Sequence, residues 1–191
     1  MIPLLWLACA EQPPTVTAPV TPPVGEEAAA PSMYELEVPL TASDGATTTL
    51  DVHRGHPVLV SMFYASCHSA CPMLVQKVRA FEETLDDPTR ADLRVLLVSL
   101  DPARDDPAAL QEAAQRYGAD PARWVLAVPP EDRMRELAAV MGIQYRPGAD
   151  GEIHHTSTLV LLDADGHPIA RSEGADGSTE SLRSALVELG S

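Results

Sequence analysis

Two nearly continuous apolar runs of strand length constrain the fold of this chain more than any other feature. They cover Pro57–Phe63 and Leu93–Leu100. A strand with one face in water would alternate apolar and polar residues, and these runs do not alternate. They are typical of central strands that are covered on both faces. The chain is therefore expected to form a layered α/β domain, with helices packed against a sheet.

Helix signals lie between and after these strands. Apolar residues from Cys71 to Leu85 fall on one helical face. Asp105 or Asp106 can cap a second helix, with Pro107 at its first position and Gly118 past its end. The other expected elements are a hairpin of 34–40 with 47–52, a strand over 124–128, a helix over 130–141, a hairpin of 158–162 with 168–171, and a helix over 179–189. This order predicts a thioredoxin-like α/β fold, with a central mixed sheet flanked by helices and an N-terminal β-hairpin.

The N-terminal segment differs in composition from the remainder. Residues 1–9 form an apolar segment ending at Cys9, and a small residue directly before a cysteine resembles a bacterial lipobox. Residues 10–32 are rich in proline and contain no basic residue, which predicts a disordered linker. Residues 33–191 are expected to form one ordered domain.

Three interpretations of this N-terminus stay open. Cys9 carries a lipid anchor, or residues 1–9 direct soluble export, or the segment is a cytosolic N-terminus without function. The apolar run is too short to span a bilayer. The first two interpretations place the domain outside the cytoplasm, on the periplasmic side of the membrane.

The charge of the chain excludes one class of partner. Lys and Arg number 13 against 28 Asp and Glu, which gives a formal net charge of −15. Such a surface repels a phosphate backbone, so nucleic-acid binding is not expected.

Cys67 and Cys71 are the residues at which chemistry is expected. If the first lies just before a helix and the second in its first turn, both sulfurs lie near the positive end of the helix dipole, which favours thiolate. Thiolates are soft donors that suit Cu(I) and zinc. A structural disulfide is one alternative, although so short a loop gives little stabilisation. A redox dithiol is another, although the familiar redox pair has two intervening residues and this pair has three.

A histidine facing this pair would complete a metal site. His154 and His155 precede the strand expected at 158–162, and Ser157 stands where thioredoxin-like reductases carry a cis-proline. His155 lies in the loop that should face the helix start. An imidazole added to two thiolates makes a set suited to Cu(I) and, with a weak fourth donor, to Cu(II). A surface histidine and ligation by His154 remain alternatives.

Three motifs in order resemble the Sco/SenC family, over roughly residues 36–189. The motifs are Phe63 followed by Cys67, Cys71 and Pro72; Ser99, Leu100, Asp101 and Pro102 followed by Arg104, Asp105 and Pro107; and His155 and Thr156 ahead of Asp163, Asp165 and Gly166. The resemblance implies a chaperone for Cu(I) or Cu(II) that assists assembly of the binuclear copper centre of cytochrome c oxidase. The implied partner is the copper-bearing oxidase subunit or another copper chaperone. The alternative is an extracytoplasmic thiol-disulfide reductase, so whether the chain is an enzyme stays open.

The same resemblance implies roles for particular residues. Cys67, Cys71 and His155 would be the copper ligands, and Cys67 and Cys71 would be the catalytic dithiol of a reductase.

Residues beside these motifs carry further expectations. Asp101 orients the site, lies near the metal or stabilises a turn, and Arg104 and Asp105 should make local turn and capping contacts. His68 is either an additional donor or faces solvent. Met73 is expected to pack in the core rather than to act as a thioether ligand.

Overall fold

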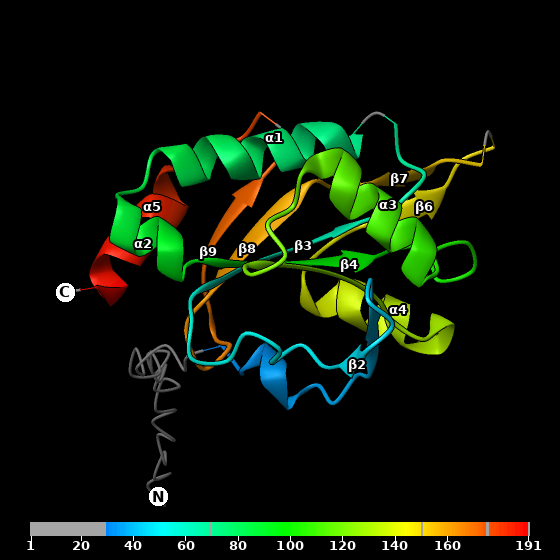
Figure 1. Cartoon of the computed structure of the whole chain (residues 1–191), viewed down its shortest axis with the longest axis horizontal. Helices are drawn as coiled ribbons and strands as arrows, with labels where there is room; N and C mark the ends of the chain where they lie inside the picture. Colours follow the sequence, from blue (N-terminus) through cyan, green and yellow to red (C-terminus); the bar gives the residue numbers. More distant parts are fainter. Residues whose placement is uncertain (1–29, 69, 150, 175, 191) are drawn as a thin grey trace, which may run out of the picture.

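The structure is a computed structural model that describes residues 30–68, 70–149, 151–174 and 176–190 (Figure 1). The predictions for Cys9 and for residues 1–29 lie outside the described residues. Within the described ranges, no helix combines the length and the apolar character needed to cross a membrane.

A seven-stranded sheet forms the middle of the domain, in the order β2-β1-β5-β4-β3-β8-β9. Its strands are β1 Leu40–Ala42, β2 Thr47–Thr48, β3 Val58–Phe63, β4 Arg94–Ser99, β5 Trp124–Val128, β8 Thr158–Leu162 and β9 Pro168–Glu173. The strands β3, β4 and β5 run parallel, and β8 and β9 continue the sheet antiparallel. Every residue of β3 is buried, as its continuous apolar run predicts.

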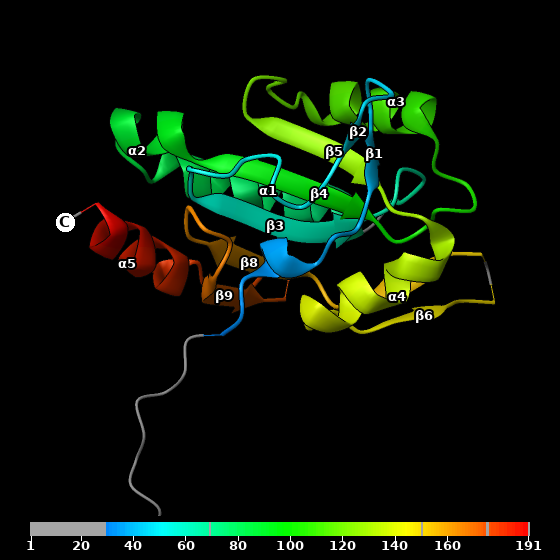
Figure 2. The ribbon, with the colours of Figure 1, turned by 90° about the horizontal axis from the view of Figure 1, so that it is seen from below.

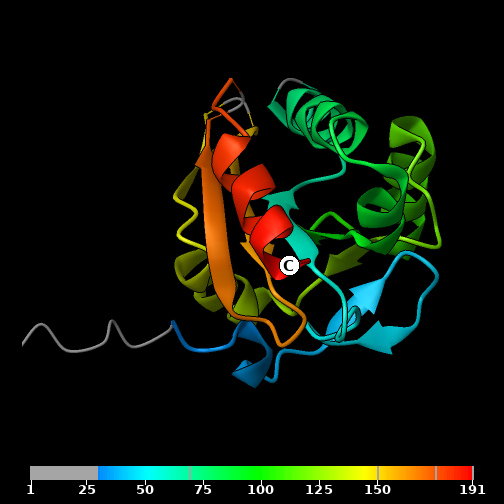
Figure 3. The ribbon, with the colours of Figure 1, turned by 90° about the vertical axis from the view of Figure 1, so that its left-hand side faces the viewer.

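Helices cover both faces of this sheet, which gives three layers (Figures 1 and 2). The helices are α1 Ala70–Glu83, α2 Asp87–Asp92, α3 Pro107–Tyr117, α4 Glu131–Val140 and α5 Glu180–Leu189. Apolar residues of α1, α3 and α5 form one buried cluster with the sheet, and those of α4 form another on the opposite face. Figure 3 shows α5, in red, lying against β9. The predicted thioredoxin-like fold, with a mixed central sheet and an N-terminal hairpin, is confirmed.

The ends of α3 follow the capping residues in the sequence. The Asp106 carboxylate accepts a hydrogen bond from the Ala109 backbone N–H at 2.8 Å, and Pro107 occupies the first turn. Gly118 ends the helix in the left-handed conformation, with φ of 58°. Asp106 is therefore the cap, which leaves Asp105 available for another contact.

The prediction of a strand over residues 34–40 is wrong. Met33–Glu35 form a 3-10 helix (η1), capped by Ser32, and β1 begins only at Leu40. The Met33 N–H donates to the carbonyl of Gly166 in the β8–β9 turn, at 2.8 Å. Tertiary packing of η1 against this turn overrides the local strand pattern.

Three short elements were not expected from the sequence. One is α2, which Asp86 caps. The other two are β6 Tyr145–Pro147 and β7 Ile153–His155, which form a separate two-stranded antiparallel sheet. The β6–β7 hairpin matters for function because it carries His155.

Gly166→Ala should destabilise the protein more than Gly45→Ala. Gly166 and Gly45 have positive φ, 88° and 82°. Alanine at either position should therefore lower the free energy of unfolding by about 1–2 kcal/mol, because an L-residue is strained in the left-handed conformation. A Cβ at Gly166 would lie 2.5 Å from the Tyr34 ring, whereas one at Gly45 meets nothing within 4 Å. We expect a further loss of about 1–3 kcal/mol at Gly166 from overpacking, measured by urea unfolding. Equal losses in the two variants would contradict the packing of η1 against this turn.

Candidate functional site

Cys67 lies in the loop that connects β3 to α1, and Cys71 lies in the first turn of α1. The Cys67 N–H donates to the Tyr64 carbonyl at 3.1 Å, which closes a tight turn after the strand. The Cys71 N–H, in the first turn of α1, donates to Cys67 Sγ at 3.2 Å. Neither cysteine forms a disulfide, and their exposed fractions are 1% and 0%. The helix start therefore supplies a hydrogen bond to one sulfur and buries both.

The prediction that the helix start favours thiolate at both cysteines is wrong for Cys71. The neighbouring Cys67 sulfur, and then burial, raise the pKa of the Cys71 thiol well above its ordinary value. Two sulfurs in contact favour a shared proton over two negative charges, and this effect outweighs the helix dipole. The second proton is therefore held on sulfur until a strong electrophile, such as a metal ion, replaces it there and the proton leaves to solvent.

The β6–β7 hairpin brings His155 to the cysteines. Its Nε2 atom lies 3.8 Å from Cys71 Sγ. Its Nδ1 atom lies 3.2 Å from the Thr156 carbonyl oxygen, which can only accept a hydrogen bond. A proton on Nδ1 leaves the Nε2 lone pair directed toward the sulfur. The ring also meets the edge of Tyr64, with centroids 6.1 Å apart and planes at 74°.

His154 does not share this position. Its side chain is exposed, and it pairs across the hairpin with Arg146, whereas His155 pairs with Tyr145. Neighbouring residues of a strand point to opposite faces, so only one of the two can face the cysteines. Recognition of a short strand at Ile153–His155 would have separated the two histidines from sequence.

The three candidate ligands are close but are not preassembled as a closed metal site. Among the residues that the structure describes, no group of three or more His, Cys, Asp and Glu side chains stands at metal-binding geometry. Instead, Cys71 Sγ contacts the imidazole, and Cys67 Sγ is held by the Cys71 backbone. The structure therefore brings Cys67, Cys71 and His155 together through these contacts.

Tyr64 and Glu152 are site residues that no sequence motif identified. The Tyr64 hydroxyl donates to the Glu152 carboxylate and accepts from the Ile153 N–H at 3.3 Å. Burial, and then this carboxylate, raise the pKa of Tyr64 above its ordinary value. The contact ties the cysteine loop to the hairpin that carries His155.

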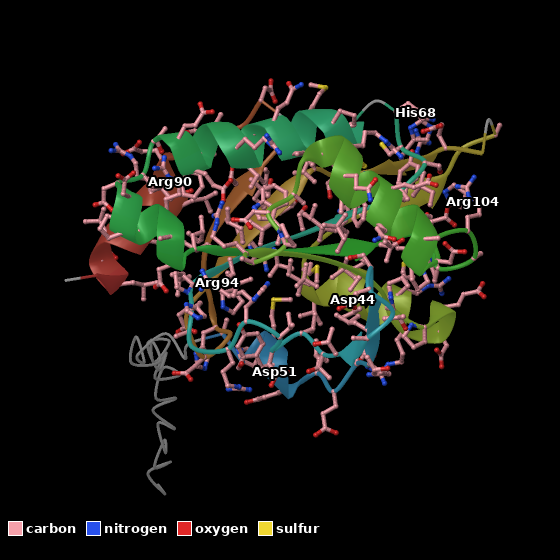
Figure 4. All side chains as sticks on the ribbon, in the orientation of Figure 1. Asp44, Asp51, His68, Arg90, Arg94 and Arg104 are labelled. Atoms are coloured by element: carbon pink, nitrogen blue, oxygen red, sulfur yellow. The ribbon has the colours of Figure 1, made fainter. Side chains whose placement is uncertain are left out.

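A cavity of about 400 Å³ opens beside this contact. Tyr64, Glu152 and His155 line it, and so does His68, whose side chain is exposed. Figure 4 shows His68 at the same corner of the molecule as Arg104. His68 thus faces solvent at the mouth of the cavity.

Asp105 makes the expected local turn contact, its N–H donating to the Asp101 carbonyl at 2.8 Å, but the expected capping role is wrong because its carboxylate makes a long-range contact instead. One carboxylate oxygen accepts from the Ala65 N–H at 2.9 Å and from the Ser99 hydroxyl at 2.6 Å. On the other side, Arg116 donates to the Ala65 carbonyl at 3.0 Å. Asp105 is 5% exposed, and its position after β4 places it under the cysteine loop. The backbone just before Cys67 is therefore fixed from both sides.

Asp101 and Arg104 hold the adjoining loop. The Asp101 carboxylate is buried and pairs with Arg104, as expected for a turn. Arg104 also donates to the Gly151 carbonyl at 3.0 Å, which is a second link to the β6–β7 hairpin.

Met73 does not pack in the core, so that expectation is wrong. It is 52% exposed, because it lies off the buried stripe of α1 that contains Cys71, Leu74, Val75 and Val78. Ser157, at the cis-proline position of the reductases, is buried, and no described residue has a cis peptide bond.

Comparisons with known proteins identify chains of similar sequence and similar fold. The family model described as SCO1/SenC matches residues 27–189. The chain is 24% identical to the SCO1 protein homolog of Bacillus subtilis (strain 168) over 159 residues, which are 81% of each protein. It also resembles the solved structure of Arabidopsis thaliana ScoI with copper bound, with a TM-score of 0.69, 15% identity and coverage of 80% of this chain and 95% of that one.

A further solved structure is that of BsSco, described as a Sco-family cytochrome c oxidase assembly protein with a disulfide switch. The TM-score is 0.65 at 20% identity, with coverage of 84% of this chain and 96% of that one. At these identities the structural matches establish the shared fold.

Replacing Asp105 by Asn should change how stability depends on pH. Burial raises the pKa of Asp105 above its ordinary value, against the hydrogen bonds from Ser99 and Ala65 that lower it. The folded state then binds the proton more tightly than the unfolded state, so stability falls as pH rises from about 4 through the folded-state pKa. Urea unfolding of both proteins between about pH 4 and pH 7 measures this. We expect wild type to lose stability relative to Asp105→Asn as pH rises, and a constant difference would contradict the buried carboxylate.

Proposed function

This chain belongs to the SCO1/SenC family, and we propose that it binds copper through Cys67, Cys71 and His155 and delivers it for assembly of the binuclear copper centre of cytochrome c oxidase. The receiving partner is the copper-bearing oxidase subunit or another copper chaperone. One observation carries the proposal: His155 Nε2 lies 3.8 Å from Cys71 Sγ, and the Cys71 N–H is hydrogen-bonded to Cys67 Sγ.

The donor set fits copper. Thiolate sulfurs are preferred by Cu(I), and an added imidazole nitrogen makes the set suitable for Cu(II) as well. The Nδ1 contact of His155 with the Thr156 carbonyl fixes the ring with Nε2 as the donor. Copper-bound Arabidopsis thaliana ScoI, which shares the fold, supports the choice of ion.

The protonation state of the pair determines when copper can bind. A disulfide cannot ligate the ion, so the cysteines must be reduced. The raised pKa of Cys71 means that copper binding releases a proton from this thiol at neutral pH. Copper is the cargo, and ligand exchange with a partner's donors removes it.

An extracytoplasmic location is part of the proposal, on the periplasmic side of the membrane and with Cys9 as a lipid anchor. Support comes from the sequence around Cys9 and from a structural relative described as a SCO1/SenC family lipoprotein from Bacillus anthracis.

A thiol-disulfide reductase is the second candidate function. It is favoured by the two reduced cysteines at the start of α1 and by the hydrogen bond that the Cys71 N–H donates to Cys67 Sγ, because a stabilised thiolate is the attacking group. The disulfide switch named for BsSco also supports it. Cys67 would attack the partner disulfide, and Cys71 would resolve the mixed disulfide.

Copper titration distinguishes the ligand set. Reduced protein titrated without oxygen should bind about one copper ion per chain, since there is a single Cys2His set. His155→Ala should weaken Cu(II) binding by at least about tenfold, because a ligand is lost. Cys67→Ser should abolish the thiolate-to-Cu(II) charge-transfer band.

His154→Ala is the matched control for this titration, since it removes the exposed neighbour on the other face of the same strand. Its copper affinity should equal that of wild type. Similar losses in both histidine variants, or no loss in either, would reject His155 as a ligand.

Turnover of insulin disulfides tests the second function. With a thiol reductant present and copper absent, a reductase should accelerate insulin reduction, and Cys67→Ser should abolish the acceleration because the attacking sulfur is gone. If the wild-type rate equals that of the reductant alone, the reductase function is excluded and the chaperone function remains.

A further inference from the structure

The outer face of the β6–β7 hairpin carries a row of polar side chains. Arg146 of β6 lies directly opposite His154 of β7. One step further along, the Thr156 N–H donates to the Gln144 carbonyl at 2.9 Å, which continues the same pairing. Residues two apart in a strand share a face, so these four side chains stand together, on the face opposite to His155. All four are exposed.

This outer face is hollowed. The four residues line a cavity of about 300 Å³, together with Tyr145 and His155. Among the described residues, no acidic side chain lines this cavity. Glu152, in the same hairpin, accepts from the Tyr64 hydroxyl and lines the other cavity instead. The hollow therefore offers hydrogen-bond donors and a guanidinium, without a carboxylate of its own.

Arg146 keeps its charge available. It has no ion pair and donates to no carbonyl within the described part of the chain. Arg104, which also reaches this hairpin, is by contrast paired with Asp101 and donates to the Gly151 carbonyl. A carboxylate opposite Arg146 would stabilise the hairpin, but position 154 holds a histidine. The guanidinium is thus left for a partner from outside the chain.

The acidity of the whole chain makes this location selective. A formal net charge of −15 repels an acidic partner from most of the surface. At physiological ionic strength, exposed charges more than about 8 Å apart are largely screened, so the charges at the point of contact decide whether the partner stays. An exposed arginine without a counter-ion provides such a point.

We propose that the outer face of the β6–β7 hairpin docks an acidic segment, rich in Asp and Glu, of the protein that receives the copper. The Arg146 guanidinium binds one carboxylate through two parallel hydrogen bonds, and the side chains of Gln144 and Thr156 donate to a second. A segment held there lies against the strand that carries His155. The identity of the partner as the copper acceptor rests on the proposed function, whereas the binding of an acidic segment does not.

Peptide binding to the metal-free protein tests the docking face. The probes are two fluorescein-labelled peptides of equal length, one with glutamate alternating with glycine and one with glutamine in place of glutamate. At physiological ionic strength, fluorescence anisotropy should show tighter binding of the glutamate peptide. Arg146→Glu should weaken that binding by at least about fivefold, because an attractive charge becomes repulsive. Arg146→Gln, which removes the charge without reversing it, should give an intermediate loss.

Arg90→Glu is the matched control. Arg90 is an exposed arginine of α2, at the opposite end of the molecule from Arg104 in Figure 4, and its replacement changes the net charge equally. Its affinity for the glutamate peptide should equal that of wild type. Equal losses in Arg90→Glu and Arg146→Glu would trace the effect to net charge and overturn the inference. Equal affinity of wild type for the two peptides would overturn it as well.

Copper transfer links this face to delivery. The acceptors are two peptides with a Cys-x-x-x-Cys pair, flanked by glutamates in one and by glutamines in the other. Their sulfurs replace those of the protein on Cu(I), and their protons pass to the protein thiols. Transfer to the glutamate peptide should be at least about threefold faster, and Arg146→Glu, but not Arg90→Glu, should remove the difference.

The two proposals fail in different ways. A protein that prefers the glutamate peptide but binds no copper supports the docking face and overturns the proposed function. A protein that transfers copper to both peptides at equal rates leaves the proposed function standing and overturns the inference.

Discussion

The hydrogen bonds of the buried Asp105 carboxylate to the Ala65 N–H and the Ser99 hydroxyl determine where the site can form. Parallel strands β3 and β4 end at the same edge of the sheet, and Asp105 follows the second of them. It therefore reaches across to the backbone that leaves the first. This places Cys67 at the entrance of α1, where the Cys71 N–H is available to its sulfur.

The second half of the site depends on different contacts. His155 comes from the β6–β7 hairpin, far along the chain from the cysteines. Tyr64 holds this hairpin through Glu152, and Arg104 holds it through the Gly151 carbonyl. Both links join side chains of the sheet edge to one short segment of the hairpin. The approach of imidazole to sulfur is thus a product of tertiary structure, and local sequence determines only that each residue is available.

The sequence predicted those features that depend on local physics. The apolar runs of β3 and β4 and the Asp106–Gly118 caps of α3 are of this kind, because burial and capping are read residue by residue. Packing against the β8–β9 turn made Met33–Glu35 helical, which no local pattern shows. The raised pKa of the Cys71 thiol likewise could not be predicted from the sequence, since it depends on a neighbouring sulfur and on burial. The sequence motif indicated His155. The structure adds the β6–β7 pairing, which places His154 on the face of the strand opposite to His155.

Within the described part of the chain, the β6–β7 pair forms a sheet of its own, separate from the seven-stranded central sheet. The two sulfurs belong to the buried core, whereas the imidazole is carried by the two-stranded β6–β7 sheet. Two-stranded sheets have little stability by themselves. The donors around an ion held there would have unequal mechanical support. If copper binds at this site as proposed, the imidazole nitrogen would be the donor displaced at the lowest energetic cost, and the two sulfurs would keep the ion bound while one coordination position opened.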